Sequence, residues 1–415
     1  MNTRTATLWG VILAAFSAGA IGAGHIGKVP AALPAIRGEL GLELIVAGWV
    51  VSVFSLTGMI LGTVAGLASD RFGHHRIAIG GMLLAAVGSA AGAWAWDGWS
   101  LLAARFVEGL GFLAIVVSAP SIIAEAAHPD DRRLAVGMWG SFMPAGMSVT
   151  LLAAPGLLAT VGWRGTWLAM AAVSLVWAVL MAIVFRRVMT VRRDTGNPEN
   201  AWRNLVITLS ARGPWLLALS FSFYTLSWLA LMVWLPTFIV EQRGGSIALA
   251  SVLTLLAVAV NFPGNLMGGW ILHRGGSCAR LIGFGALVIG ICGPLMFLDV
   301  LPDVLRYGVC LLYSFLSGMV PAGVLGGAPY FAPGARQIGT TNGLIIQGSH
   351  LGQFLGPPVI AAAVALSGGW QAGAWVFAGC GVGALIFAFI IGVEERRLTA
   401  VQAAAQDSSS QDNSA

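Results

Sequence analysis

The sequence predicts an all-α membrane protein whose twelve transmembrane helices form two pseudo-symmetric six-helix bundles. Of its 415 residues, 57% are hydrophobic and only 9% are charged, whereas an ordinary soluble domain is about 25% charged. The apolar residues form segments of about 20 residues, the length that a helix needs to cross a bilayer. A charged turn between two of these segments, Gly66–Arg76, has a weaker copy about two hundred residues later, Gly269–Gly276, which indicates an internal repeat.

The polar breaks between the apolar segments define the expected domains. The longest break divides the chain into an N-terminal six-helix bundle over 1–186, a cytoplasmic linker over 187–212 and a C-terminal six-helix bundle over 213–393. Residues 394–415 are polar and end in a run rich in Ser, Gln and Asp, so we expect a disordered cytoplasmic tail. The expected spans are 7–36, 45–68, 76–96, 100–127, 134–160, 164–186, 213–240, 247–272, 279–298, 303–331, 337–366 and 371–393.

Within the linker, apolar residues lie at helical spacing. Trp202, Leu205, Val206 and Leu209 would share one face of a helix, which favours a short amphipathic helix on the membrane surface. The alternative is an irregular linker with one frayed turn, and the spacing does not decide between the two.

The basic residues predict the orientation of the chain in the membrane. Alternate polar breaks, taken together with the two termini, carry sixteen of the 22 Lys and Arg residues. The opposite breaks carry only Arg37, Arg164, Arg243 and Arg306. Because cytoplasmic loops carry the excess of basic residues, we expect both termini in the cytoplasm, which requires an even number of spans.

The same composition argues against several classes of protein. The net charge of +5 does not indicate nucleic-acid binding, because the arginines punctuate apolar segments and form no basic stripe with interleaved aromatics. The four cysteines show no Cys-x-x-Cys or Cys/His spacing, so we expect no metal site and no disulfide framework. No nucleotide-binding motif or Ser/His/Asp arrangement is recognisable, so we expect neither a cofactor nor an enzymatic activity.

Sequence motifs indicate that the chain resembles the major facilitator superfamily of secondary transporters. The charged turn matches the superfamily pattern G-x-x-x-D-R-x-G-x-x-R at Gly66, Asp70, Arg71, Gly73 and Arg76. With the six-plus-six layout, the resemblance covers nearly the whole chain and implies a monomeric transporter of the bacterial inner membrane that works by alternating access. Further matches are the fourth-span pattern R-x-x-x-G-x-G at Arg105, Gly109 and Gly111, and part of a fifth-span signature at Gly140, Pro144 and Gly146.

Two features bear on what such a transporter carries and in which direction. The incomplete fifth-span signature leaves the direction open, because the full signature is associated with exporters. A looser similarity to bacterial anion permeases of the cyanate and nitrate kind rests on the seventh-span sequence Trp-Leu-Pro-Thr, residues 234–237.

The charged residues of the turn are candidates for a gate on the cytoplasmic side. Asp70 closes the second span, and Arg71 and Arg76 flank the third. A carboxylate and guanidiniums placed there can bridge the ends of neighbouring helices, with Glu125 of the fourth span as a further member. For Arg71 and Arg76, the alternative to a gating role is that their charges only set the orientation of the spans in the membrane. In the second copy His273 replaces the acid, so we expect the cytoplasmic gate to differ between the two halves. The gating set is Gly66, Asp70, Arg71, Gly73, Arg76 and Glu125.

Ionisable side chains inside the predicted spans need a reason, since a charge at the bilayer centre costs about 2.5–3.5 kcal/mol on insertion scales. His25 and Lys28 are three residues apart on one face of the first span, and Arg105 and Glu108 are three apart in the fourth. We expect His25, Lys28 and Arg105 to contact an anionic substrate, and Glu108 with His25 to carry protons. The alternatives are that Lys28 extends to the outer interface and that Arg105 and Glu108 only neutralise each other.

The C-terminal half offers polar side chains without charge. Tyr224 and Trp228 are one turn apart in the seventh span, and Asn261 and Asn265 are one turn apart in the eighth. These side chains either form interhelical hydrogen bonds, worth about 0.6 kcal/mol each, or line a substrate cavity. We include them among the candidate substrate contacts, together with the eleventh-span residues Asn342, Gln347, His350 and Gln353.

The leading hypothesis is therefore a secondary transporter that moves a small anion with protons by rocking of its two halves around a midplane site. Its expected partners are a small-molecule substrate, protons and the lipid bilayer, and no nucleic acid. One alternative is an efflux pump for lipophilic drugs or metabolites, which the 16 Trp and 19 Phe residues favour. A non-transporting membrane receptor is the other alternative, although the chain shows no large soluble appendage.

Overall fold

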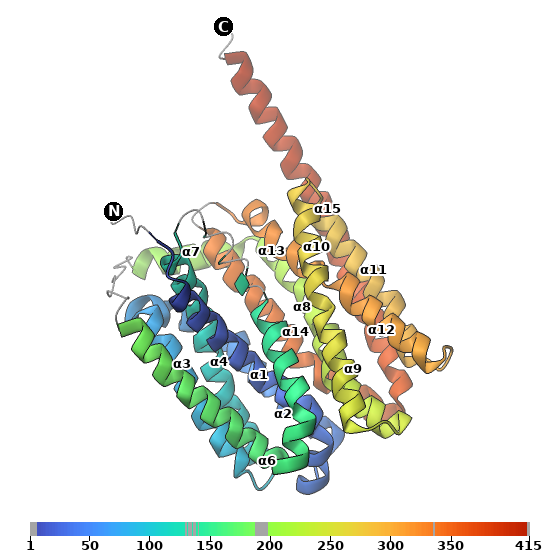
Figure 1. Cartoon of the computed structure of the whole chain (residues 1–415). Coiled ribbons are helices and arrows are strands. Elements are labelled where there is room, and N and C mark those ends of the chain that lie inside the picture. The colour runs from blue at the N-terminus through green and yellow to red at the C-terminus, as the bar shows by residue number, and fades with distance from the viewer. Residues whose placement is uncertain are drawn as a thin grey trace.

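A computed structural model describes residues 6–128, 131, 135, 138–139, 141–186, 198–334 and 337–412, without the side chains of Thr63, Leu67, Asp70, 198–201 and 398–412. The described residues form helices and no strand, and Figure 1 shows them as two bundles side by side. The N-terminal bundle contains α1 (Trp9–Leu40), α2 (Leu44–Phe72), α3 (His74–Ala93), α4 (Gly98–Ala126) and α6 (Phe142–Arg186). After α7 (Pro198–Ser210), the C-terminal bundle contains α8 (Arg212–Thr237), the π-helix η1 (Phe238–Gln242), α9 (Ile247–Ala259), α10 (Asn261–His273), α11 (Cys278–Phe297), α12 (Asp303–Ser317), α13 (Val320–Phe331), α14 (Ile338–Ser367), the 3₁₀ turn η3 (Trp370–Ala372) and α15 (Gly373–Asp412).

The helices confirm the predicted passes through the membrane. Among the described residues, eleven helical segments are long and apolar enough to cross a bilayer. One of them, α6, has 45 residues and leaves helical geometry at Gly162, where φ is 67° and ψ is −177°. A helix of this length would extend for about 68 Å, twice the hydrocarbon thickness. Figure 1 shows α6 as two arms that run back alongside each other. With the break at Gly162, α6 therefore supplies the fifth and sixth passes, and the total reaches the expected twelve.

Two passes of the C-terminal bundle are interrupted inside the membrane. The eighth pass consists of α9 followed directly by α10, and the tenth consists of α12 followed by α13. The two interruptions meet, because a Cβ atom at Gly264 of α10 would overlap the carbonyl of Phe315 in α12. Helices in membranes associate through such close backbone contacts at small residues.

The close helix contacts repeat between the two halves. A Cβ atom at Gly146 in α6 would overlap the backbone carbonyl of Ala20 in α1. In the second half, a Cβ atom at Gly348 in α14 would likewise overlap the carbonyl of Ala218 in α8. The two contacts join the fifth pass to the first and the eleventh to the seventh. Their separation of about two hundred residues matches the offset between the two charged turns.

Replacing Gly146 with Ala should therefore destabilise the protein by about 1–3 kcal/mol, as overpacked sites do. The backbone carbonyl of Ala20 cannot rotate away from an added methyl group as a flexible side chain could. The matched control is Gly156→Ala in the same helix, where an added Cβ meets nothing within 4 Å. At that site we expect a gain of up to about 1 kcal/mol from helix propensity. Thermal unfolding in detergent measures both, and equal midpoints for the two variants would contradict the prediction.

The linker contains the helix that the sequence predicts, whereas the tail is helical where the sequence predicts disorder. The predicted surface helix is present as α7, whose Trp202, Val206 and Leu209 are exposed, and the preceding residues 187–197 lie outside the described ranges. Over 394–412, where the polar composition predicts disorder, the backbone continues as the last part of α15. The Ala-rich run 400–405 in this segment explains the helix, since Ala has the highest helix propensity.

Candidate functional site

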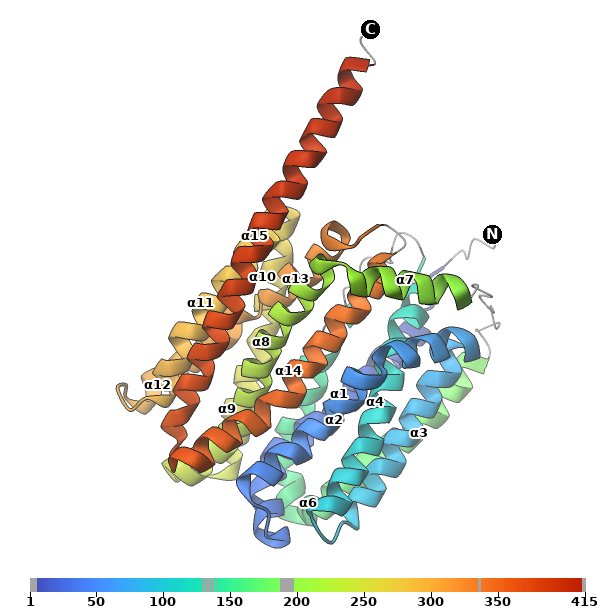
Figure 2. The same ribbon diagram turned by 180° about the vertical axis from the view of Figure 1, so that it is seen from behind.

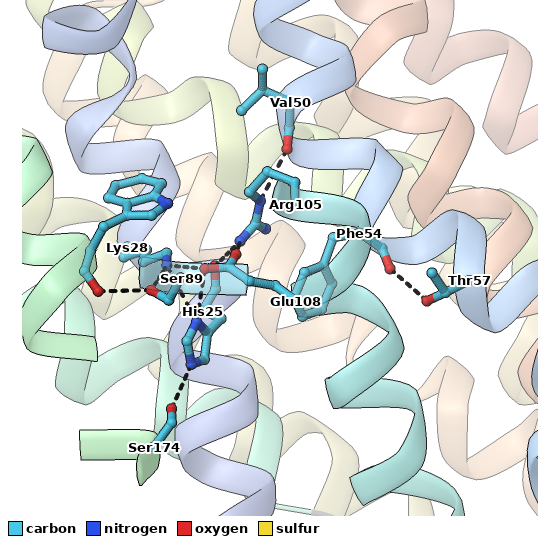
Figure 3. A network of polar contacts seen from close by, with 10 residues as sticks. His25, Lys28, Val50, Phe54, Thr57, Ser89, Arg105, Glu108 and Ser174 are labelled. Carbon is cyan, nitrogen blue, oxygen red and sulfur yellow. Dashed lines mark hydrogen bonds and ion pairs between the residues drawn. The ribbon is translucent and has the colours of Figure 1, made fainter. Parts of the chain in front are cut away.

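Four ionisable side chains from α1 and α4 meet inside the N-terminal bundle (Figure 3). We call His25, Lys28, Arg105 and Glu108 the buried ion cluster. Lys28 Nζ donates hydrogen bonds to Glu108 Oε1 at 2.5 Å and to Ser89 Oγ of α3 at 2.8 Å. The Arg105 guanidinium donates to the other carboxylate oxygen, Glu108 Oε2. Lys28, Arg105 and Glu108 are 0% exposed and His25 is 1% exposed, so the cluster is sealed from solvent in this conformation.

Lys28 is enclosed by α3 and α6 and does not extend to the outer interface. Its ammonium lies 4.2 Å from the centre of the Trp167 ring of α6. Ser89 Oγ accepts from Lys28 and donates to the Trp167 carbonyl at 2.8 Å. A desolvated cation over an aromatic face gains about 2 kcal/mol. The lysine is thus held by the carboxylate, the hydroxyl and the ring together.

Arg105 is held from the side of α2. Its guanidinium carbon lies 4.6 Å from the centre of the Phe54 ring. Arg105 Nε donates to the carbonyl of Val50 at 3.2 Å, and Arg105 Nη1 donates to the carbonyl of His25 at 2.9 Å. Arg105 Nη2 has no hydrogen-bond partner within the ranges that the structure describes. The guanidinium therefore keeps one nitrogen, Nη2, that can donate to a further acceptor.

The ring of His25 links Glu108 and Lys28 to Ser174 of α6. His25 Nε2 lies 2.9 Å from Ser174 Oγ of α6, and His25 Nδ1 lies 3.3 Å from both Lys28 Nζ and Glu108 Oε1. Because an ammonium only donates, the neutral ring accepts from Lys28 at Nδ1 and donates from Nε2 to Ser174. A proton added at Nδ1 would turn this nitrogen into a donor to Glu108.

Small residues bring the helix backbones close enough to form the cluster. A Cβ atom at Gly88 of α3 would lie 2.6 Å from the backbone nitrogen of Glu108. A Cβ atom at Gly109 would overlap the carbonyl of Phe54 in α2. Glycines thus let α2 and α3 pack directly against α4 on either side. Gly109 belongs to the fourth-span motif, and this contact gives that position a physical reason.

The cluster carries a net charge of about +1 when His25 is neutral, since two cations face one carboxylate. A buried ion pair recovers its desolvation cost only through good geometry and further hydrogen bonds, which Ser89 and the backbone carbonyls supply here. The excess positive charge can attract an anion or respond to a proton. Across the part of the chain that the structure describes, no group of three or more His, Cys, Asp or Glu residues is placed to hold a metal ion.

The polar residues of the seventh and eighth spans form a separate network in the C-terminal bundle. Asn261 Nδ2 donates to the carbonyl of Ser314 at 2.8 Å and to Tyr224 Oη at 3.1 Å. Asn265 Nδ2 donates to Asn261 Oδ1 at 2.9 Å, and Trp228 Nε1 donates to Ser314 Oγ at 3.2 Å. The network joins α8, α10 and α12, so it fastens the interrupted eighth and tenth passes to the seventh.

The eleventh-span residues lie on α14, which packs against α2 of the other half. The ring of His350 fills the space in which Gly58 of α2 lacks a side chain. Ser55 Oγ of α2 donates to Gln353 Oε1 at 3.3 Å. We call this contact the α2–α14 seam, and it is distinct from the buried ion cluster. The predicted residues on this helix are Asn342, Gln347, His350 and Gln353, of which His350 and Gln353 are buried and the other two half-buried.

The charged turn ends α2 and begins α3. Gly73 has a φ of 95°, a conformation that favours glycine, which accounts for this motif position. Ser69 Oγ lies 2.8 Å from both His74 Nδ1 and Ser118 Oγ of α4, and His74 Nε2 lies 3.7 Å from Glu125 Oε1. Arg71 and Arg76 are exposed, whereas the side chain of Asp70 and the fifth-span residue Gly140 lie outside what the structure describes.

At the opposite end of the molecule, an ion pair joins the two halves. Arg37 Nη1 of α1 donates to Glu241 Oε1 of η1 at 2.6 Å. Neither residue was assigned a role from its sequence position alone. The available signal was the position of Arg37, because basic residues are rare in the breaks on that side of the membrane.

Sequence reasoning also missed the residues that complete the buried ion cluster. Ser89 and Ser174 accept and donate at its edges, and Trp167 lies over Lys28. A serine in an apolar span is a weak signal, because it satisfies its own hydroxyl through the helix backbone in many helices. The partners become recognisable only when the packing of α3 and α6 is known.

The comparisons with known proteins agree with this architecture. Residues 7–357 match the sequence profile of the Major Facilitator Superfamily. The probable sulfoacetate transporter SauU of Cupriavidus necator is 25% identical over 389 residues, which cover 88% of this chain and 89% of that protein. The 3-(3-hydroxy-phenyl)propionate transporter of Escherichia coli is 29% identical over 346 residues, which cover 80% and 81%.

Among solved structures, the fold resembles that of a bacterial homologue of the human lysosomal transporter Spinster in an inward-facing and unoccupied conformation. The TM-score is 0.72 at 17% identity, and the match covers 92% of this chain and 94% of that one. The family match spans most of the chain, and the relatives are transporters of similar length. The chain therefore belongs to the major facilitator superfamily and is a membrane transporter of small molecules, not an enzyme.

Proposed function

We propose that this transporter carries a small organic anion together with protons across the bacterial inner membrane. The observation that supports this most strongly is the buried ion cluster, in which Lys28 and Arg105 share the single carboxylate of Glu108. Ionisable groups at membrane depth are costly and mark substrate or ion pathways. An excess cation in that position favours a negatively charged substrate.

The names of the relatives support an organic anion. The two relatives named above are described as a probable sulfoacetate transporter and a 3-(3-hydroxy-phenyl)propionate transporter. Both substrates are sulfonate or carboxylate anions near neutral pH. An acidic small molecule is the substrate class that these names share, and we extend it to this chain.

The substrate would lie between the two halves, where the superfamily fold places its midplane site. From the N-terminal half, His25, Lys28 and Arg105 would act on it through their positive field and the unused Arg105 Nη2 donor. From the C-terminal half, we propose contacts with Tyr224, Trp228, Asn261 and Asn265. We also propose that the α14 residues Asn342, Gln347, His350 and Gln353 contact the substrate from the α2–α14 seam.

Proton coupling would use Glu108 and His25. A proton bound by Glu108 removes the only negative charge of the cluster and releases Lys28 and Arg105 from their common partner. His25 Nδ1, 3.3 Å from Glu108 Oε1, is placed to deliver or accept that proton. A change in protonation would thus change how strongly the cluster attracts an anion, which links the two fluxes.

We propose that the charged turn gates the cytoplasmic side, with both termini in the cytoplasm. Gly66 and Gly73 would allow close helix contact, and Asp70, Arg71, Arg76 and Glu125 would supply the charges. The ion pair between Arg37 and Glu241 would close the opposite side in this conformation. The two gates would alternate during the cycle.

Replacing Asp70 with Asn should lower the transport rate at least about fivefold, a typical coupling between distant sites, while the protein still inserts into the membrane. Asp70→Glu keeps the charge and is the matched control, for which we expect a smaller loss. Uptake into proteoliposomes measures both variants at equal amounts of inserted protein. An unchanged uptake rate for Asp70→Asn would exclude the gating role.

Uptake into proteoliposomes under an imposed pH gradient tests the proposed function. The panel should contain small sulfonates and aromatic carboxylates, with neutral amides of the same size and lipophilic cations as controls. We expect accumulation of an acid against its gradient, and its loss when an ionophore collapses the pH difference. If only lipophilic cations are transported, the efflux alternative is correct and the proposal fails.

A further inference from the structure

The second copy of the charged turn, Gly269–Gly276, borders a groove of about 1360 Å³ on the C-terminal bundle. The groove lies where α10, α11, α13 and α15 come together. Figures 1 and 2 show that this is the end of the molecule at which α1 begins and α7 lies. It is separate from the buried ion cluster and from the α2–α14 seam, and the transport cycle proposed above gives it no role.

The two copies of the turn differ in charge. In the first copy, the acids are Asp70 in the turn and Glu125, the next-to-last residue of α4. In the second copy, His273 stands in place of Asp70, and the next-to-last residue of α13 is Tyr330. The second copy therefore has no acid at either of these two positions.

Three cationic or protonatable side chains border the groove: His273, Arg280 and Arg396. All three are exposed, and among the residues that the structure describes no carboxylate lies within 4.0 Å of their nitrogens. The groove also contains Glu395, whose carboxylate is directed to the first turn of α11. It accepts from Ser277 Oγ at 2.6 Å and from the backbone nitrogen of Cys278 at 3.0 Å.

Below this charged rim, the wall of the groove is apolar. Phe389 of α15 is 70% exposed and Tyr330 of α13 is 61% exposed. Gly283 of α11 leaves a recess, because an added Cβ would meet only Ala388, at 3.6 Å. A tyrosine at the membrane interface has its ring in the apolar region and its hydroxyl in the polar one. The groove therefore changes from basic to apolar along its length, as the profile of a phospholipid does.

We propose that this groove binds an anionic phospholipid of the cytoplasmic leaflet, with the phosphodiester between Arg280 and Arg396 and an acyl chain along Gly283 and Phe389. The proposal rests on the orientation proposed above, in which this end faces the cytoplasm. Basic pockets between transmembrane helices on that side attract anionic headgroups, and each basic residue adds to the attraction. The charge complementarity distinguishes an anionic lipid from a zwitterionic one.

Lipid titration of the purified, delipidated protein in a neutral detergent tests this site. Native mass spectrometry would count bound phosphatidylglycerol and phosphatidylcholine, and the thermal unfolding midpoint would follow each titration. We expect phosphatidylglycerol to bind at least about tenfold more tightly. The double variant Arg280→Gln/Arg396→Gln should weaken that binding by about tenfold to thirtyfold, the effect of two interfacial charges.

Two further variants separate the site from general electrostatics. Gly283→Leu keeps all charges but fills the apolar recess, and we expect it to weaken phosphatidylglycerol binding as well. The matched control is Arg203→Gln/Arg212→Gln, which removes two exposed charges outside the groove and should leave binding unchanged. Three results would each overturn the proposal. The first is equal affinity for phosphatidylglycerol and phosphatidylcholine, and the second is an equal loss of phosphatidylglycerol binding in the control variant. The third is that inorganic phosphate alone raises the unfolding midpoint as much as phosphatidylglycerol does. None of these outcomes depends on the transport assay, so the proposed function is tested separately.

Discussion

Replacing Glu108 with Gln should abolish proton-driven accumulation of the substrate and markedly destabilise the folded protein. The amide has the same shape, but it leaves Lys28 and Arg105, both 0% exposed, without their shared carboxylate. Removing one partner of a buried ion pair costs about 3–5 kcal/mol, and the two remaining cations repel each other. We expect a lower midpoint of thermal unfolding and no accumulation under an imposed pH gradient.

The double variant Lys28→Gln/Glu108→Gln separates the two effects. It retains Arg105 and the same net charge as the native cluster, so most of the stability should return. Without a carboxylate to bind the proton, accumulation should remain absent, while exchange of substrate across the membrane without a gradient should persist. If Glu108→Gln reaches the native accumulation ratio at the same pH difference, Glu108 does not carry the proton.

The twelve passes and the family could be predicted from the sequence because they depend on composition and on short local motifs. Span length, basic breaks and the motif at Gly66–Arg76 are readable without knowledge of the packing. The turn between the fifth and sixth passes was predicted at the right place, but its form was not. A single glycine with positive φ, Gly162, lets α6 continue as one helical segment through the turn.

The site could be predicted only in part, because periodicity does not reveal which face of a membrane helix is turned inward. Nearly every face is apolar in this chain, so the helical spacing of polar residues carries little information. Lys28 and Glu108 were recognised as unusual because charge is rare in a span. Their contact across α1 and α4, and the part played by Ser89 and Trp167, depend on packing that no local pattern encodes.

The α14 residues illustrate the same difficulty. Gln347, His350 and Gln353 were predicted as substrate contacts because polar side chains in a span suggest a cavity. The structure places His350 and Gln353 against Gly58 and Ser55 of α2, at the contact between the halves. A polar residue on one face of a helix can equally serve a neighbouring helix.

Replacing Lys28 with Met should weaken binding of the substrate while leaving a protein that still folds. The variant leaves Arg105 and Glu108 as a balanced pair, and Met fills much of the space of the lysine stem. Ser89 loses one hydrogen-bond partner, at a cost of about 1–2 kcal/mol. The anion, however, loses the excess positive charge of the cluster. At about 10 Å and an effective dielectric constant of about 20, one unit charge contributes about 1.7 kcal/mol, or about a sixteenfold change in Kd.

A thermal-shift titration of the purified protein with organic anions measures this affinity, with neutral compounds of similar size as references. Lys28→Arg keeps the charge and should retain more of the affinity than Lys28→Met. Ser89→Ala removes the hydroxyl without changing the charge, so it reports the structural contribution alone. If Ser89→Ala weakens anion binding as much as Lys28→Met, the hydrogen-bonded packing and not the charge selects the substrate. If only neutral or cationic compounds stabilise the native protein, the excess charge serves another purpose, because a substrate without negative charge gains nothing from Lys28.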